Sequence, residues 1–272
     1  MKDLTKSKLK VFSLSVFVIT LLTAALRTIC LFAFYEPNVG YFRAGVASVI
    51  VTALYVLGLA LCVCPLFLLP REQITVDGAF RKNLSFALCC PAVIAFFVCG
   101  IVILGNGAIR AIKFDVLTGI FCIISALFFL SSALSQLPPF KGRFDASRPW
   151  LCIAVIAALL LMLSSAYFDM TVNINGPFTT VFLFSLLSCA LFLLSEIRHD
   201  IGRPLALAHF VSGLAAFFLS ASSAIGNLLF CLFGDTGAGK TLSDPTRPIL
   251  LLCVSLFVLA RLLSFTAPKQ EN

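Results

Sequence analysis

The sequence predicts an all-α integral membrane protein, because its composition and its pattern of long apolar runs both exclude a soluble fold. It is 60% hydrophobic with 28 Phe, its mean hydropathy is +1.07, and only 12% of its 272 residues are charged. Soluble domains are typically about half apolar and a quarter charged. A soluble fold of this length would leave too much of that apolar surface in water.

Each apolar run is long enough to cross the membrane as a helix, which takes roughly 20 residues for about 30 Å of hydrocarbon. We expect eight transmembrane helices, at residues 11–35, 43–69, 84–105, 115–137, 149–169, 177–195, 204–233 and 247–267. The first follows a basic leader, MKDLTKSKLK, as in a signal peptide. Its apolar run is longer than a signal peptide needs and lacks a small-x-small cleavage site, so we expect it to be retained.

The basic residues predict the orientation. With the N-terminus in the cytoplasm, 13 Lys and Arg fall on the cytoplasmic side and five on the outer side. Cytoplasmic loops of membrane proteins carry the excess of basic residues. We therefore expect both termini in the cytoplasm, in a cell membrane of the bacterial cytoplasmic type. The net charge of +8 is explained in the same way, so nucleic acid is not expected as a partner.

Similar segments recur along the chain. PLFLLPRE, ALFFLSSA, ALFLLSEI and SLFVLARL share a Phe at positions 67, 128, 192 and 257. At a longer period, AFFVCGIVILGN, ending at Asn106, resembles AFFLSASSAIGN, ending at Asn227. The matches predict two parallel four-helix halves, 1–140 and 141–272, each made of two helical hairpins, as in repeat-built transporters. Alternatively, the matches are compositional, because Leu, Phe and Ala dominate membrane helices.

One segment, GDTGAGKT (Gly234–Thr241), matches the phosphate-binding pattern G-x-x-x-x-G-K-[ST]. That loop works where a buried strand delivers it to a helix N-terminus. Here NLLFCLF continues an apolar span upstream, and Pro245 follows where a helix would have to run. We therefore interpret the match as a loop between two spans, with no nucleotide site.

Four acids are expected near the outer ends of the four hairpins, namely Glu36, Asp115, Asp169 and Asp235. If the hairpins repeat around an axis, these carboxylates converge, and a ring of carboxylates at a pore or cavity mouth attracts cations. Asn106 and Asn227 would add neutral oxygens. The alternative is that short outer loops hold acids as helix caps or solvated surface.

No Asp or Glu lies in the middle of an expected span, which argues against a proton-coupled carrier with a buried carboxylate. Arg27 and Arg261 do lie within spans. We expect both to extend toward the interface, although Arg27 is also a candidate for binding an anionic substrate. His209 is expected to be a polar group in a helix contact.

No metal, cofactor or catalytic residues are expected. The 11 Cys all lie in or beside apolar runs, where they behave as small hydrophobes. Small residues four apart, Ala154 with Ala158 and Ala216 with Ser220 and Ala224, predict closely packed helices. Serines at 164, 165, 222 and 223 either line an outer polar cavity or bond back to helix carbonyls.

Three classes of function remain. The first is a permeation or binding protein for a small solute or cation, with an outward-facing polar site. The second is a non-catalytic subunit or sensor that contacts a membrane protein partner. The third is an enzyme acting on lipid-linked substrates, since the chain is similar in size and span count to polyprenyl-diphosphate phosphatases. It lacks their Ser-rich acidic segment and basic phosphate motif, so we rank that class last.

Overall fold

A computed structural model describes residues 2–36, 41–43, 45–69, 82–110, 112–135, 137, 140, 142–168, 176–203, 205–234 and 244–265. Its helices are α1 (Lys2–Phe34), α2 (Gly45–Val63), α3 (Pro65–Leu68), α4 (Lys82–Arg110), α5 (Lys113–Leu134), α6 (Arg148–Tyr167), α7 (Pro177–Asp200), α8 (Ala206–Phe233) and α9 (Thr246–Phe265). Strands β1 (Tyr35–Glu36) and β2 (Tyr41–Phe42) pair antiparallel beyond the end of α1.

The eight expected spans are confirmed. Within the described ranges, eight helical segments are long and apolar enough to cross a membrane, with α2 and α3 together forming the second. The chain is therefore a polytopic membrane protein of the lipid bilayer. The sixth span, expected to end at residue 195, is longer than expected, because α7 continues to Asp200 through a charged last turn.

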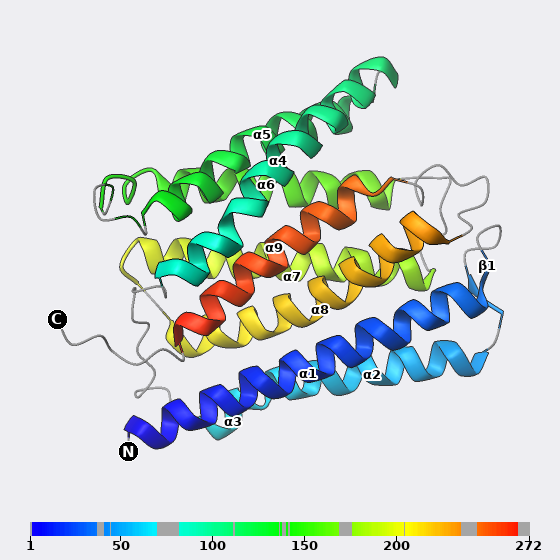
Figure 1. The fold of residues 1–272 in the computed structure, drawn as a ribbon, viewed down its shortest axis with the longest axis horizontal. Coiled ribbons are helices and arrows are strands. Elements are labelled where there is room, and N and C mark those ends of the chain that lie inside the picture. The colour runs from blue at the N-terminus through cyan, green and yellow to red at the C-terminus, as the bar shows by residue number, and fades with distance from the viewer. Residues whose placement is uncertain are drawn as a thin grey trace.

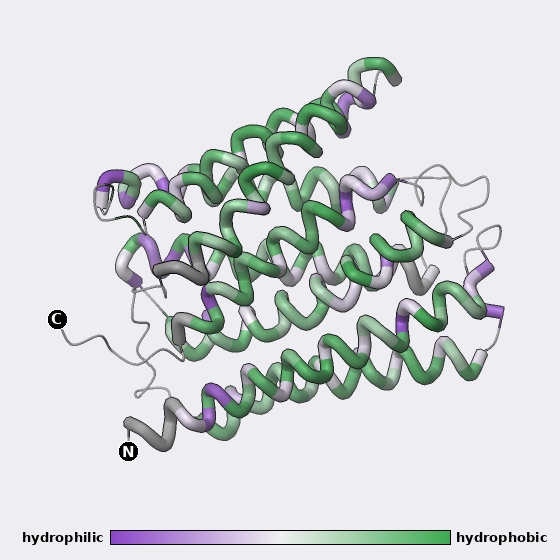
Figure 2. Tube along the Cα trace, viewed as in Figure 1, coloured by the Kyte–Doolittle hydropathy of each residue, from purple (hydrophilic) through white to green (hydrophobic). Residues whose placement is uncertain are grey.

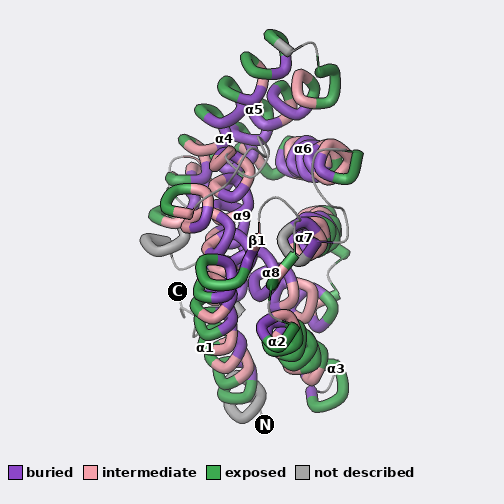
Figure 3. Tube along the Cα trace, turned by 90° about the vertical axis from the view of Figure 1, so that its right-hand side faces the viewer, coloured by how far each residue is buried: buried purple, intermediate pink, exposed green. Residues whose placement is uncertain are grey.

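The long helices run roughly side by side, with α8 and α9 in the middle of the bundle (Figure 1). The start of α1 and the end of α9 lie at the same end, which we call the N-terminal end; the opposite one is the far end (Figure 1). The pair α1 and α2 lies along one edge, against α8, and the pair α4 and α5 along the other, against α9 and α6 (Figures 1 and 3).

The burial of each helix depends on its place in the bundle. Figure 3 shows long buried stretches on α8 and α9, whereas α2 is mostly exposed and would face lipid. The small-residue faces are at helix contacts as expected: the two alanines of α6 and the small residues of α8 are buried, namely Ala154, Ala158, Ala216, Ser220 and Ala224.

Glycines allow α4 and α5 to approach backbone to backbone. A Cβ at Gly107 would lie 2.7 Å from the backbone nitrogen of Val116, and one at Gly119 would lie 2.6 Å from that of Leu104. Close approach through small residues is the usual means of association in lipid, where no hydrophobic force drives helices together.

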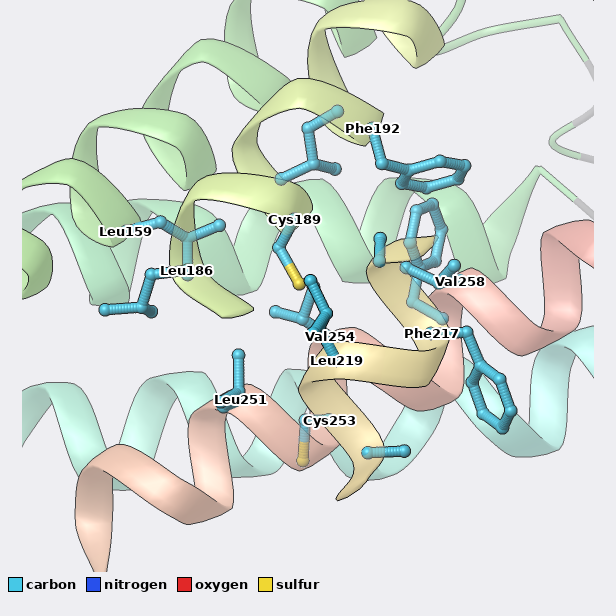
Figure 4. Packing of buried hydrophobic residues seen from close by; sticks show 14 of the residues in the cluster. Leu159, Leu186, Cys189, Phe192, Phe217, Leu219, Leu251, Cys253, Val254 and Val258 are labelled. Atoms are coloured by element: carbon cyan, nitrogen blue, oxygen red, sulfur yellow. The ribbon is translucent and has the colours of Figure 1, made fainter. Parts of the chain in front are cut away.

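Aliphatic and aromatic side chains fill the centre. Figure 4 shows Cys189 and Phe192 of α7 facing Val254 and Val258 of α9. Of the four Phe that the repeated segments share, three meet: the rings of Phe128 and Phe257 lie 5.5 Å apart, and those of Phe192 and Phe257 lie 6.5 Å apart. Phe67 instead is 82% exposed on α3. The internal repeat itself stays a prediction.

Candidate functional sites at the two ends of the bundle

Hydrophilic residues gather mainly toward the ends of the bundle (Figure 2). Some of these residues are buried. At the N-terminal end, four helices contribute to what we call the buried charge cluster. Its members are Arg148 at the start of α6, Glu196 and Asp200 in the last turns of α7, His209 in the first turn of α8 and Arg261 near the end of α9.

Glu196 is at the centre of this cluster, and its side chain is fully buried. One of its oxygens pairs with Arg261 and lies 3.5 Å from Nη2 of Arg148. The other lies 3.3 Å from Nε2 of His209. Nη1 of Arg148 also lies 3.6 Å from Asp200. Two arginines and two carboxylates thus balance in charge.

The direction of the helices explains why these charges meet. A cation at a helix N-terminus and anions in a last turn both oppose the helix dipole. Because α6 and α7 are adjacent and antiparallel, the first residue of α6, Arg148, lies beside the last turns of α7, which hold Glu196 and Asp200. The ion pairs offset the unfavourable dipole terms on both helices.

Two expectations are wrong here. The hydropathy pattern predicts Glu196 just outside a span, but α7 includes it within its membrane segment, so the argument against a buried carboxylate fails. Arg261 is expected to extend to the interface, but it is buried against Glu196. Pairing inside the bundle replaces the water that each group would otherwise have to reach.

His209 is a helix-contact residue, as expected. Its Nδ1 lies 2.9 Å from the hydroxyl of Ser195 on α7, which in turn lies 3.3 Å from the hydroxyl of Ser212. The ring of Phe192 lies 5.0 Å from that of His209. The three shared Phe residues thus place an aromatic layer between the buried charge cluster and the middle of the bundle.

A smaller polar cluster joins α5, α6 and α9 at the far end; we call it the far-end cluster. The hydroxyl of Ser165 donates to Oδ1 of Asp115 at 3.1 Å and accepts from Nη2 of Arg247 at 3.0 Å. Arg247 and Asp115 themselves lie 3.6 Å apart and are each nearly one-fifth exposed. Asp244 caps α9 by accepting from the backbone N–H of Thr246 at 3.0 Å.

Arg27 is buried between α1 and α8, so the expectation that it extends to the interface is also wrong. Its Nη2 donates to Oδ1 of Asn227 at 3.0 Å, and its guanidinium carbon lies 5.9 Å from the centre of the Tyr55 ring. Gly226 makes room for it, since a Cβ there would lie 3.2 Å from Cδ of Arg27. The structure thus brings together two residues of the expected outer site, Arg27 and Asn227.

The other expected site residues lie apart from that pair. Glu36 pairs with Arg43 across the hairpin at 3.2 Å, and Asp115 belongs to the far-end cluster. Asn106 is exposed on α4. Asp169 and Asp235 lie outside the described residues, so convergence of the four acids stays a prediction.

Most of the phosphate-loop match also lies outside the described residues. What precedes it is helix α8, which ends at Phe233, with Gly234 as its cap. The expected continuation of an apolar span is therefore confirmed, and a helix occupies the place of the strand that a phosphate loop needs.

The outer serines divide between the two expected roles. Ser164 and Ser222 donate back to helix carbonyls, at 2.9 Å and 2.6 Å. Ser165 instead joins the far-end cluster, and Ser223 accepts from Nδ2 of Asn227 at 3.4 Å. Over the described part of the chain, no three His, Cys, Asp or Glu are grouped so that they could hold a metal ion.

One signal in the sequence could have found the buried charge cluster. In the repeated segments, Phe192 precedes Glu196 by four residues, and Phe257 precedes Arg261 by four. Residues four apart share a helix face. An acid and a base therefore occupy equivalent positions beneath phenylalanines that pack together.

Comparison of the chain with models of known protein families, with curated proteins and with solved structures finds no match. A function for this chain therefore has to be inferred from the chemistry at the two ends of its bundle.

Proposed function

We propose that the chain carries a small solute or cation across a bacterial cytoplasmic membrane, opening alternately to its two faces, and that it is not an enzyme. In this proposal the N-terminal end faces the cytoplasm and the far end faces outward. The buried charge cluster closes the N-terminal end, and the far-end cluster closes the far end.

One observation supports this most directly: α6 and α9 are each tied to neighbouring helices at both of their ends. At the N-terminal end the ties are Arg148 and Arg261, which share Glu196. At the far end they are Ser165 and Arg247, which share Asp115. Rocking of one helix group against another requires a closure at each face that breaks when the other forms.

The outward-facing polar site of this carrier would include Arg27 and Asn227. They lie on α1 and α8, about two turns inside the far end, with the Tyr55 ring beside them. A guanidinium, an amide and an aromatic ring can orient a small polar solute. The acids Glu36, Asp115, Asp169 and Asp235 would raise the local concentration of cations at the mouth.

Thiol accessibility in nanodiscs, where both faces meet water, tests the proposal. Cys152 is buried one turn into α6 from Arg148, with its thiol 3.6 Å from the Leu193 carbonyl, so it reports on the N-terminal end. A Thr118→Cys substitution, one turn into α5 from Asp115, reports on the far end. Each reporter is the only cysteine in its variant.

E196Q should speed maleimide labelling of Cys152 about tenfold and slow labelling at position 118, because opening one end closes the other. D115N should do the reverse. The matched control is E36Q, whose exposed pair with Arg43 ties no two long helices together. If each variant speeds labelling at its own end and leaves the other unchanged, the bundle does not alternate and the proposal is wrong.

A further inference from the structure

We propose that His209 and Glu196 form a reversible proton-binding site, and that the bound proton loosens the closure of the N-terminal end. The site itself is independent of the proposed function. The effect on closure rests on that function, because it assumes that the buried charge cluster is what holds the end shut.

Hydrogen-bond geometry around Ser195 leads to this inference. A hydroxyl has one proton to donate. The hydroxyl of Ser195 lies 2.6 Å from the Phe192 carbonyl, and that of Ser212 lies 3.1 Å from the His209 carbonyl. With both hydroxyls donating to these carbonyls, the Ser195 oxygen is an acceptor for His209, so Nδ1 carries a proton.

That assignment determines what happens on the other side of the ring. Nε2 of His209 lies 3.3 Å from a carboxylate oxygen of Glu196. With the ring proton on Nδ1, two lone pairs would face each other there unless one more proton lies between them. The geometry therefore fits a pair that holds one proton beyond a neutral imidazole and an ionised carboxylate.

Loss of that proton has a defined route. The proton on Nδ1 leaves to water at the N-terminal end, and the proton between the ring and Glu196 stays on Nε2, which donates it in a hydrogen bond to the carboxylate. Ser195 then turns from the Phe192 carbonyl and donates to Nδ1. No bond between heavy atoms changes, and the charge of the cluster falls by one.

The charged groups around His209 and Glu196 explain how one bound proton would affect the buried charge cluster. The charged or titratable groups that face the pair are Arg148 and Cys152 from α6, His199 and Asp200 from α7, Arg261 from α9 and Cys89 from α4. With both histidines neutral, the arginines and carboxylates balance. A bound proton adds one positive charge where the medium screens weakly, and both arginines are then held less tightly by Glu196.

The chain offers a direct test, because His199 and His209 are its only two histidines. In H199Q, labelling with ¹⁵N-histidine makes His209 the only imidazole signal in nanodiscs. In a titration that extends from below to above the usual range of histidine, about pH 5 to 8, Nδ1 should carry a proton at the acid end and lose it at the alkaline end. A ring whose Nδ1 stays protonated, or stays bare, throughout overturns the site.

Two variants at Glu196 sharpen the result. E196Q removes the carboxylate and should abolish the pH-dependent change. E196D keeps the charge that the two arginines need but withdraws the oxygen from Nε2, so the change should move to lower pH; an unmoved transition counts against the site. S188A is the matched control, since Ser188 on the same helix donates to the Ser185 carbonyl and should leave the titration unchanged.

The effect on closure has its own measurement. Labelling of Cys152, divided by its rate in unfolded protein at the same pH to remove thiol chemistry, should rise several-fold at the acid end. With E196D, the rise should shift with the His209 transition. If the histidine titrates and Cys152 does not respond, the link to closure is overturned while the proton site stands.

Discussion

The two ends of the bundle use similar chemistry in different surroundings. Each has an arginine of α9 facing a carboxylate of another helix, with a serine hydroxyl nearby. At the N-terminal end Glu196 is fully buried, whereas at the far end Asp115 and Arg247 are each nearly one-fifth exposed. The same pair of charges attracts by about 1 kcal/mol in water at 4 Å and by about 4 kcal/mol at an effective dielectric constant of 20.

That difference decides how each end would open. Water can replace either partner at the far end, so opening there costs little. At the N-terminal end, separation would leave a buried charge uncompensated, which is expensive. A change in charge, such as a bound proton, is the cheaper way to open it.

The largest expected effect is the loss of Glu196. E196A leaves Arg148 and Arg261 without their shared carboxylate, so the free energy of unfolding should fall by about 3–5 kcal/mol. D115A should cost about 1 kcal/mol, as a partly exposed pair does. Denaturation in mixed micelles measures both, with E36A as a control that should change nothing. Equal losses for E196A and D115A would remove the contrast between the two ends.

The contact between Arg27 and Asn227 tests whether burial alone makes the loss of a polar contact costly to the free energy of unfolding. N227A removes the oxygen that accepts from Arg27, and a hydrogen bond to a charged group contributes about 1.5–3 kcal/mol. The control is N106A, since Asn106, which ends the similar sequence segment, is exposed. If the two variants are equally stable in the same assay, the bond between Arg27 and Asn227 contributes nothing.

A backbone change can open the far end without touching its charges. In G107A the new Cβ would lie 2.7 Å from the Val116 nitrogen and 2.9 Å from Cβ of Asp115, so the start of α5 must move. Overpacking of this kind costs about 1–3 kcal/mol. G105A, on the same helix with nothing within 4 Å, should be neutral. Labelling at position 118 should rise in G107A alone; a rise in both variants would point to general loosening of α4.

The smallest effect concerns Tyr35, at the far end. Burial raises its pKa, and nearby Arg27 offsets part of the rise. Absorbance titration should show Tyr35 ionising above the ordinary tyrosine range, with Y35F removing the late component. The folded state holds the Tyr35 proton more tightly than the unfolded state does. The stabilisation that results is therefore fully present below the ordinary tyrosine pKa of about 10. It is lost as pH rises further. A single transition at the ordinary value would show that Tyr35 is accessible to water.

Hydropathy alone predicts the eight spans, because each must bury about 20 apolar residues in lipid. It misses the buried charge cluster for the same reason. Glu196 follows the last continuous apolar run of α7, so an apolar window ends before it, and Arg261 has no acidic neighbour in sequence. Their pairing depends on how α7 and α9 pack, which local composition does not encode.

The far-end residues are partly predictable, for a different reason. Asp115 and Asn227 stand out by their positions relative to the two similar sequence segments, but their partners Arg247 and Arg27 come from other helices. The position of a residue along a span can be predicted from its neighbours. Its partner across the bundle depends on helix order and rotation, which only the folded chain determines.

The separation of Glu196 and Arg261 in sequence has a consequence for biosynthesis. A ribosome adds Glu196, in α7, 65 residues before it reaches Arg261. Arg148 is already present, but its single charge must then serve both Glu196 and Asp200. An acidic residue within a segment raises its cost of insertion at the translocon. Stable entry of α7 into the bilayer should therefore depend on α9, and nascent chains that stop before residue 261 should remain at the insertion machinery or be degraded.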